Sequence, residues 1–209
     1  MTKKDEEKVN RTISSLKDHG FEAIYVKNKD KARAEILKHI PPTAKVGIGG
    51  SATIREIGII PRLKEQGNVI YDHWNEELSP EQVLETRKAQ MTSDVFLSST
   101  NALTESGELV SREGIGNRTN SMCFGPGKVI IAAGTNKIVP DVHAALKRIK
   151  EVAAPLRNKS LNTANPCVET GVCQDCNLPT RICRITLIME RKPVLTDILV
   201  IVIGENLGY

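Results

Sequence analysis

The sequence predicts an α/β fold with an open, mainly parallel sheet flanked by helices, and a cysteine-rich loop near the carboxyl terminus. Apolar, strand-like runs alternate with amphipathic helical segments along most of the 209 residues, which is the pattern of βαβ units. Aromatic residues make up only 3% of a chain that is 40% hydrophobic, so the core must consist mainly of Ile, Val, Leu and Ala. The length suits one compact domain, and we expect residues 1–209 to form it.

The first half of the chain contains helices and strands that alternate one by one. Glycine and proline set most of their ends, because Gly20 stops the first helix and Pro41 follows the second. In chain order these elements are a helix over 7–19, a strand over 21–26, a helix from Asn28 to before Pro41, a strand over 44–48, a helix from near Thr53 to Gln66, and a strand over 69–72.

The second half continues the alternation but includes two long polar segments. Ser79-Pro80 starts a helix that continues over 83–91, because proline fits the first helical position. The later elements are a strand over 94–98, a polar segment over 101–127 with a short strand at 109–110, a strand over 128–133, a helix from Asp141 to about Val152 that Ala154-Pro155 ends, a polar segment over 156–184, and strands over 185–189 and 198–203.

The charge pattern argues against nucleic acid and membranes as partners. The net charge of +4 comes from 29 basic and 25 acidic residues that are interspersed, so no basic patch for phosphates is indicated. The longest apolar run, 198–203, is far too short to span a bilayer. The amino-terminal segment is polar and has no signal-peptide core, so we expect a cytoplasmic protein.

A glycine loop between a strand and a helix predicts a site for an anion. Gly49 and Gly50 allow close approach of a ligand to the backbone, and Ser51 and Thr53 add hydroxyl donors at the start of the next helix. A phosphate or carboxylate would be held there. The same residues are also compatible with a simple tight turn in which Ser or Thr caps the helix.

A dinucleotide site is a rival interpretation of this loop. Gly47, Gly49 and Ala52 match the pattern G-x-G-x-x-A, and Asp72 follows about 20 residues later at a strand end, where an acid would bind the ribose. Two helices and a strand precede the loop, although this fingerprint usually opens its domain.

The polar central segment supplies candidate catalytic and ligand-binding side chains. Loops at the carboxyl ends of parallel strands are where open α/β sheets bind ligands. The acids are candidate general bases or nucleophiles, and the amides and cations are candidate anion-binding residues, although an exposed acid in a glycine-rich hairpin is more often only solvated. The candidates are Glu105, Glu108 and Glu113 for catalysis, and Asn101, Asn117, Arg118, Asn136 and Lys137 for the anion.

Four cysteines near the carboxyl terminus form the strongest chemical motif of the chain. Cys167, Cys173, Cys176 and Cys183 lie within the loop 160–184 with spacings of five, two and six residues between them. Four thiolates can hold a 4Fe-4S cluster or close a zinc site. A single C-x-x-C pair with an outlying cysteine on each side favours iron–sulfur over zinc, and over free or redox-active thiols.

The central motifs resemble those of the LUD family, named for the lactate-utilisation domain, which includes lactate-utilisation protein C. The resemblance extends from the glycine loop to the terminal Gly204-Glu-Asn-Leu-Gly-Tyr209, and it rests on Asn101-Ala-Leu-Thr-Glu-Ser-Gly-Glu-Leu-Val110, Gly116-Asn-Arg118, Phe124-Gly-Pro126, Lys128-Val-Ile-Ile-Ala-Ala-Gly134 and Asn136-Lys137. Glu113-Gly114 stands where family members often carry Asp-Gly. The cysteine segment belongs to only part of the family.

The resemblance implies a fold similar to that of sugar-phosphate isomerases and CoA transferases, in which the glycine loop binds an anion. It implies a function in the oxidation of lactate to pyruvate beside iron–sulfur partner proteins. Three hypotheses follow: a 4Fe-4S protein with an accessory or electron-transfer role in lactate or hydroxy-acid oxidation; an enzyme acting on a phosphorylated sugar or acyl-CoA; and a zinc-stabilised binding module. A homo-oligomer is compatible with each of them.

Overall fold

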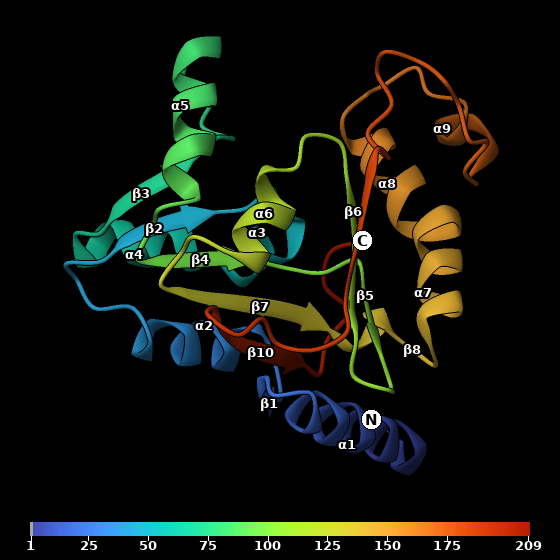
Figure 1. The fold of residues 1–209 in the computed structure, drawn as a ribbon, viewed down its shortest axis with the longest axis horizontal. Helices are drawn as coiled ribbons and strands as arrows, with labels where there is room; N and C mark the ends of the chain where they lie inside the picture. Colours follow the sequence, from blue (N-terminus) through green and yellow to red (C-terminus); the bar gives the residue numbers. More distant parts are fainter. Residues whose placement is uncertain (1) are drawn as a thin grey trace.

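The computed structural model describes residues 2–209 and contains two sheets (Figure 1). The larger sheet has six strands in the order β1-β10-β7-β4-β2-β3, and every neighbouring pair is parallel. This sheet confirms the predicted α/β class. Its strands are β1 (Glu22–Val26), β2 (Lys45–Ile48), β3 (Val69–Asp72), β4 (Val95–Ser98), β7 (Lys128–Gly134) and β10 (Asp197–Ile203).

Strand β10, which lies between β1 and β7, explains why this sheet is covered on both faces. Residues 198–203 are all apolar and 2% exposed or less, so they cannot face water on either side. Leu199, Ile201 and Ile203 pack into one hydrophobic cluster with α2, α3 and α4, whereas the alternate residues of β10 pack into a second cluster. That second cluster includes residues from α1, α6 and the smaller sheet.

The helices that cover the first face are short and well capped. They are α2 (Lys29–Lys38), α3 (Ala52–Ile57) and α4 (Ile59–Gln66). Asn28 caps α2 as expected, and Ser51 caps α3 by accepting a hydrogen bond from Ile54 N. The single helix expected between Thr53 and Gln66 is divided, because Gly58 adopts a left-handed conformation with φ of 69° that ends α3 and begins α4.

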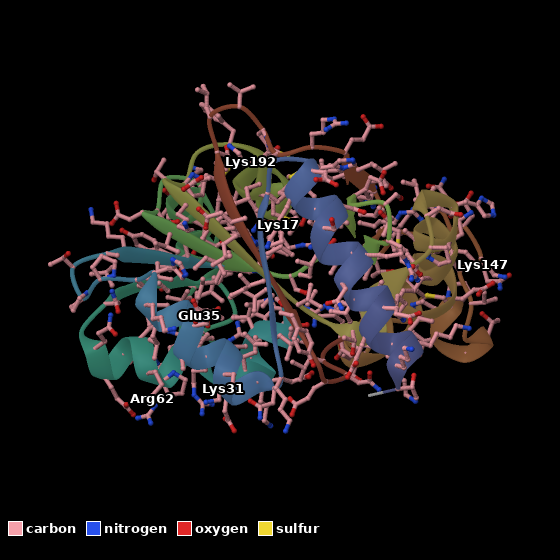
Figure 2. The ribbon with its side chains drawn as sticks, turned by 90° about the horizontal axis from the view of Figure 1, so that it is seen from below. Lys17, Lys31, Glu35, Arg62, Lys147 and Lys192 are labelled. Atoms are coloured by element: carbon pink, nitrogen blue, oxygen red, sulfur yellow. The ribbon has the colours of Figure 1, made fainter. Side chains whose placement is uncertain are left out.

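Two longer helices lie on other sides of the larger sheet. Helix α1 (Lys3–Asp18) begins earlier than expected, because Thr2 and Asp5 form a capping box. Helix α5 (Pro80–Gln90) packs on β3 and β2. Viewed from below, the labelled charged side chains of α1, α2 and α4 lie on the outer surface, as amphipathic helices require (Figure 2).

The smaller sheet is built largely from the polar central segment. Its order is β8-β5-β6-β9, with β6 antiparallel to both β5 and β9. These strands are β5 (Ala102–Thr104), β6 (Leu109–Glu113), β8 (Ile138–Val139) and β9 (Ile185–Met189). The polar segment 101–127 was predicted to contain only the short strand at 109–110, but it also contains β5 and helix α6 (Asn117–Cys123). Their few apolar residues have too little periodicity to predict them.

A continuous helical run covers the outer side of the smaller sheet, on the right of Figure 1. It consists of α7 (Val142–Arg148), a π-helical segment (Ile149–Ala153) and α8 (Ala154–Ser160). The prediction that Ala154-Pro155 ends the helix is wrong. Pro155 lacks an N–H donor, and the π-helical segment directly before it shifts the hydrogen-bond register so that the helix continues to Ser160. The short α9 (Cys167–Thr170) follows.

No helix within residues 2–209 has both the length and the hydrophobicity that crossing a bilayer requires.

Candidate functional site

A cleft of about 420 Å³ opens at the carboxyl edge of the larger sheet. Residues that directly follow β2, β3, β4 and β7 line it, together with residues from the β6–α6 connection, α8 and the cysteine-rich loop. Ligands of open α/β sheets bind at this edge, because the loops after parallel strands converge there. The cleft is therefore the main candidate site of the molecule.

The structure brings most of the predicted site residues together in this cleft. Eight of the twelve residues proposed as catalytic or anion-binding line it: Gly50, Ser51, Thr53, Asn101, Glu113, Asn117, Arg118 and Lys137. They come from segments that are up to 87 residues apart in the sequence (Gly50 to Lys137). The parallel topology accounts for this convergence, because each segment follows or adjoins the end of a strand.

Four predicted residues lie outside the cleft lining: Gly49, Asn136, Glu105 and Glu108. Glu108 directly precedes β6 and accepts hydrogen bonds from the hydroxyls of Thr104 and Ser106. Gly49 is held in the sheet edge, where its N–H donates to Leu97 O at 2.8 Å, and a side chain there would collide with Ser98. Asn136 binds the last residues of the chain, accepting from Leu207 N and donating to Gly208 O. Glu105 lies at the β5–β6 turn and pairs with Arg11 of α1 at 2.7 Å. The structure therefore assigns Glu105 no position at the site.

Lys137 is a buried amine at the base of the cleft. Only 3% of the residue is exposed, and Nζ donates to Thr53 Oγ1 and Ser99 Oγ, both at 2.9 Å, and to Thr100 O at 3.2 Å. Burial lowers its pKa from 10.5 to about 7, and the charges of Arg148 and Arg118 act in the same direction. Among residues 2–209, no carboxylate lies within ion-pair distance of this amine.

Arg118 is the most constrained cation of the cleft. All five of its N–H groups have acceptors in the protein, which are Glu113 Oε2, Ser99 O, Ser111 Oγ, Asn101 Oδ1 and Arg112 O. Burial lowers its pKa, while the charge of Glu113 acts to raise it. Since no donor is left over, Arg118 positions the walls of the cleft and contributes charge rather than a hydrogen bond to a ligand.

Glu113 is the acidic side chain among the described residues that line the cleft. Its Oε1 accepts from both the backbone N and the hydroxyl of Thr119, at 3.0 and 2.8 Å, and Oε2 accepts from Arg118. These contacts hold the carboxylate at the start of α6. The predicted catalytic role of Glu113 is thus compatible with its position, in contrast to that of Glu105.

A buried glutamine fixes the chemistry of His73, a cleft residue that the sequence did not single out. Gln90 Nε2 lies 2.7 Å from Ile48 O and 3.0 Å from Tyr71 O, so this atom must be the amide nitrogen. It also lies 2.8 Å from His73 Nδ1, and since an amide nitrogen cannot accept, Nδ1 is the acceptor and the two amide hydrogens are shared among three acceptors. The ring proton is left on Nε2. Burial, followed by the charge of Arg87, lowers the pKa of His73 from 6.5 to about 4, so the ring is neutral at pH 7.

Trp74 forms a second wall of the cleft together with two arginines. The guanidinium carbons of Arg55 and Arg157 each lie 4.3 Å from the centre of a Trp74 ring. Arg55 is held in turn by a bidentate pair with Asp72, at 2.7 and 3.0 Å. The carboxylate of Asp72 is thereby occupied, which disfavours the dinucleotide interpretation in which it would bind a ribose.

Three further arginines provide hydrogen-bond donors that the protein does not use up. Arg87 Nε is buried and has no partner among residues 2–209. Arg112 and Arg157 each use one donor, toward Thr186 Oγ1 and Ser160 Oγ. No sequence motif marks these arginines, because each lies alone in a helix or strand. With Arg118 they make the cleft positive even when Lys137 is neutral, because Glu113 is the one acidic side chain that residues 2–209 contribute to the lining.

The four cysteines of the carboxyl-terminal loop line one small cavity beside the cleft. Cys167, Cys173, Cys176 and Cys183 are all free thiols and share this cavity with Arg181. Burial raises the pKa values of Cys167 and Cys183, and neighbouring cysteines add to the effect. Within residues 2–209, no three Cys, His, Asp or Glu side chains are grouped as a metal ion requires. In number and chemistry, however, the donor set fits a 4Fe-4S cluster or zinc.

Polar contacts hold the cysteine-rich loop against the helical run. Cys173 N donates to Lys150 O in the π-helical segment at 2.8 Å. Arg181 connects two parts of the loop by donating to Cys176 O and Cys183 O, at 2.6 and 2.8 Å. Asn165 Nδ2 donates to Asn158 Oδ1 of α8 at 2.6 Å. The loop therefore has a defined conformation although it contains little apolar surface.

The cleft and the cysteine cavity are neighbours. Ile182 lines both of them, and it directly precedes Cys183 in the chain. Two consecutive residues of α8 also serve the two sites, since Arg157 lines the cleft and Asn158 lines the cysteine cavity. The molecule thus places a cationic cleft and a group of four thiols on either side of one shared wall.

Comparison with known proteins gives a family and a fold. A search of curated proteins finds no match. A crystal structure of a DUF162 family protein from Deinococcus radiodurans superposes with a TM-score of 0.54 and 14% identity, covering 96% of this chain and 98% of that one. At this identity the likeness concerns the fold alone. The model of the LUD domain family matches residues 9–203, which is nearly the whole chain, and the protein therefore belongs to the LUD domain family.

Proposed function

We propose that this protein binds a small anionic metabolite in the cleft and holds a 4Fe-4S cluster in the neighbouring cysteine cavity. It would act as an accessory or electron-transfer component in the oxidation of lactate or a related hydroxy acid, beside iron–sulfur redox partner proteins. The observation that carries the proposal is the shared wall, because Ile182 separates four thiols from a cationic cleft. Such an arrangement suits a redox group that acts close to a bound substrate.

The charge and size of the cleft support an anionic ligand of metabolite size. A hydroxy acid carries a carboxylate, which pairs with guanidinium groups through charge-assisted hydrogen bonds. Arg87, Arg112 and Arg157 have donors available for it. The hydroxyl of Ser51 and the Nε2 proton of His73 add neutral donors at the same cleft.

The cysteine cavity supports the second half of the proposal. Thiolates are the ligands that iron–sulfur clusters take, and four of them are needed for one 4Fe-4S cluster. A cluster would supply one-electron chemistry there. The four cysteines would hold it, and Arg181, which already bonds to two carbonyls of the loop, would offset part of the thiolate charge.

Metal analysis of protein purified without oxygen tests this function. We expect a brown protein with absorbance near about 400 nm and about four irons and four sulfides per chain. Cys176→Ser should lose most of the iron, because it removes a ligand. Cys123→Ser is the matched control, since Cys123 lies on α6 outside the cavity, and it should keep the full content. Zinc without iron in the wild-type protein would refute the electron-transfer role.

A second candidate function is an enzyme that acts on a phosphorylated sugar or an acyl-CoA. The three arginines with unused donors favour it, because phosphate groups bind several guanidinium groups at once. Titration with ribose 5-phosphate and with acetyl-CoA, followed by Trp74 fluorescence, distinguishes the two functions. Binding of either ligand much tighter than that of lactate favours the enzyme. Zinc in the cysteine cavity would be compatible with this function as a purely structural ion.

A further inference from the structure

The chemistry of Lys137 is not explained by binding an anion alone. A buried lysine normally has a carboxylate partner, because an isolated charge in a protein interior is costly. The three acceptors around Nζ of Lys137 are two hydroxyl oxygens and a backbone carbonyl, all of them neutral. Glu56 is the acid whose charge acts on Lys137, and it makes no hydrogen bond to the amine. The environment therefore favours the neutral amine.

A neutral amine in this position is a nucleophile. After loss of one proton, Nζ has two N–H donors for its three acceptors, Thr53, Ser99 and Thr100, so one of these contacts is given up and the lone pair takes its place. The residue is almost fully buried, yet it lines the cleft, so the lone pair can be reached only by a molecule bound there. The lowered pKa of about 7 agrees with this geometry, since much of the amine is then neutral at pH 7 to 8.

Other side chains already supply the positive charge that an anion needs. Arg87, Arg112 and Arg157 line the cleft and have unused donors, and Arg118 adds charge although its donors are occupied. Loss of the Lys137 charge therefore leaves the cleft cationic. The arginines can therefore hold the anionic group of a ligand while the neutral amine of Lys137 contacts a different group of the same ligand.

We propose that Lys137 forms an imine with the carbonyl carbon of an anionic aldehyde or keto acid bound in the cleft. The lone pair of Nζ forms the new C–N bond, and the carbonyl oxygen leaves as water with the two amine protons. No oxidant or reductant is required. The inference rests on the proposed function in that it needs an anion to bind in the cleft, and it is independent of any metal in the cysteine cavity.

Reductive trapping on the full-length protein tests the imine. The protein is incubated with pyruvate or glyoxylate and sodium cyanoborohydride, which reduces an imine to a stable secondary amine. We expect one adduct per chain by intact mass, located at Lys137 by peptide mapping. An unmodified Lys137 peptide with both compounds, or labelling of Lys137 no greater than that of exposed lysines, would overturn the proposal.

Two variants separate this chemistry from simple anion binding. Lys137→Arg places a permanent cation at this position that cannot form an imine. The adduct should therefore be lost, while Arg87, Arg112 and Arg157 still hold pyruvate and its binding still changes the Trp74 fluorescence. Lys128→Arg is the control, because Lys128 lies at the opposite end of β7 and pairs with Glu22 and Asp197 at the surface; it should keep the adduct. If Lys137→Arg does not fold, peptide mapping of the wild-type protein still decides. Binding without an adduct refutes the imine alone, whereas absence of both also refutes the proposed function.

Discussion

Two arginines of the cleft that look equivalent in the sequence differ in how many of their N–H groups have acceptors. Arg118 has an acceptor for each of its five N–H groups, so it forms part of the frame of the site. Arg87 Nε is buried and has no partner within residues 2–209, although a buried donor without an acceptor is costly. A bound anion would satisfy it. We therefore predict opposite roles for the two arginines, structural for Arg118 and ligand-binding for Arg87.

The unused N–H donor of Arg87 should contribute to the binding of an anion in the cleft. Arg87→Met should weaken binding of pyruvate or inorganic phosphate by about tenfold or more, because one charge-assisted hydrogen bond contributes about 1.5–3 kcal/mol. The free energy of unfolding should change little, since the variant removes no bond within the protein. Fluorescence titration of Trp74, the only tryptophan of the chain, measures the affinity.

The control for this variant is its sequence neighbour. Lys88→Met removes an exposed cation that pairs with Glu85 on the surface of α5. Its effect on affinity should be small, because a surface charge is largely screened by salt. Equal loss of affinity in both variants would mean that Arg87 acts only through the general field of the protein.

The stability of the folded protein should depend on pH because of His73. Its pKa is about 4 in the folded protein and about 6.5 in the unfolded chain, so only the unfolded chain gains a proton between these values. Stability should therefore fall as the pH is lowered from 6.5 towards 4. With allowance for the exposed part of the ring, the loss is about 1–2 kcal/mol.

Urea denaturation at pH 7.5 and pH 5 measures this effect. His73→Gln should remove part of the pH dependence, whereas His143→Asn, on α7 outside the cleft, should leave it unchanged. A wild-type protein and a His73→Gln variant with the same pH dependence would show that His73 is not held neutral.

At the scale of elements, β10 accounts for much of the stability of the fold. It lies between β1 and β7 and buries both of its faces. Ile201→Ala should destabilise the protein by about 2–5 kcal/mol, because it leaves a cavity in a site with no exposed neighbour. The control is Val69→Ala on the edge strand β3, where the side chain is 54% exposed, and the cost should be below about 1 kcal/mol.

Urea denaturation at pH 7.5 provides both values. Losses of similar size in Ile201→Ala and Val69→Ala would show that the interior around β10 repacks after truncation. The comparison is direct because both positions lie in strands of the same sheet.

The elements that could be predicted from the sequence are those whose apolar residues keep a regular period. The strands of the larger sheet have continuous apolar runs, and capping residues such as Asn28 and Ser79 mark helix starts, so both were predicted closely. Strand β5 and helix α6 were missed because tertiary contacts, rather than their own pattern, stabilise them. The continuation through Pro155 was missed because a π-helical segment has no sequence signal of its own.

At the scale of the whole molecule, the topology explains which site residues were predictable. Ser51, Thr53 and Lys137 follow strand ends, and a parallel sheet brings such positions to one edge, so their convergence follows from the fold class. Arg87 and Arg157 come from helices whose placement depends on packing that no local pattern records. The four cysteines were recognisable by spacing, but their position beside the cleft follows only from how the loop folds against α8.

Helix α8 has a thermodynamic consequence for the two cavities. Arg157 and Asn158 are adjacent in one rigid helical turn, and each contacts a different cavity. A metal bound by the four cysteines would act on this turn from one side, and an anionic metabolite bound by Arg157 would act on it from the other. Thermodynamic linkage makes such coupling reciprocal. If bound metal changes the affinity for the metabolite by a given factor, the bound metabolite changes the affinity for the metal by the same factor.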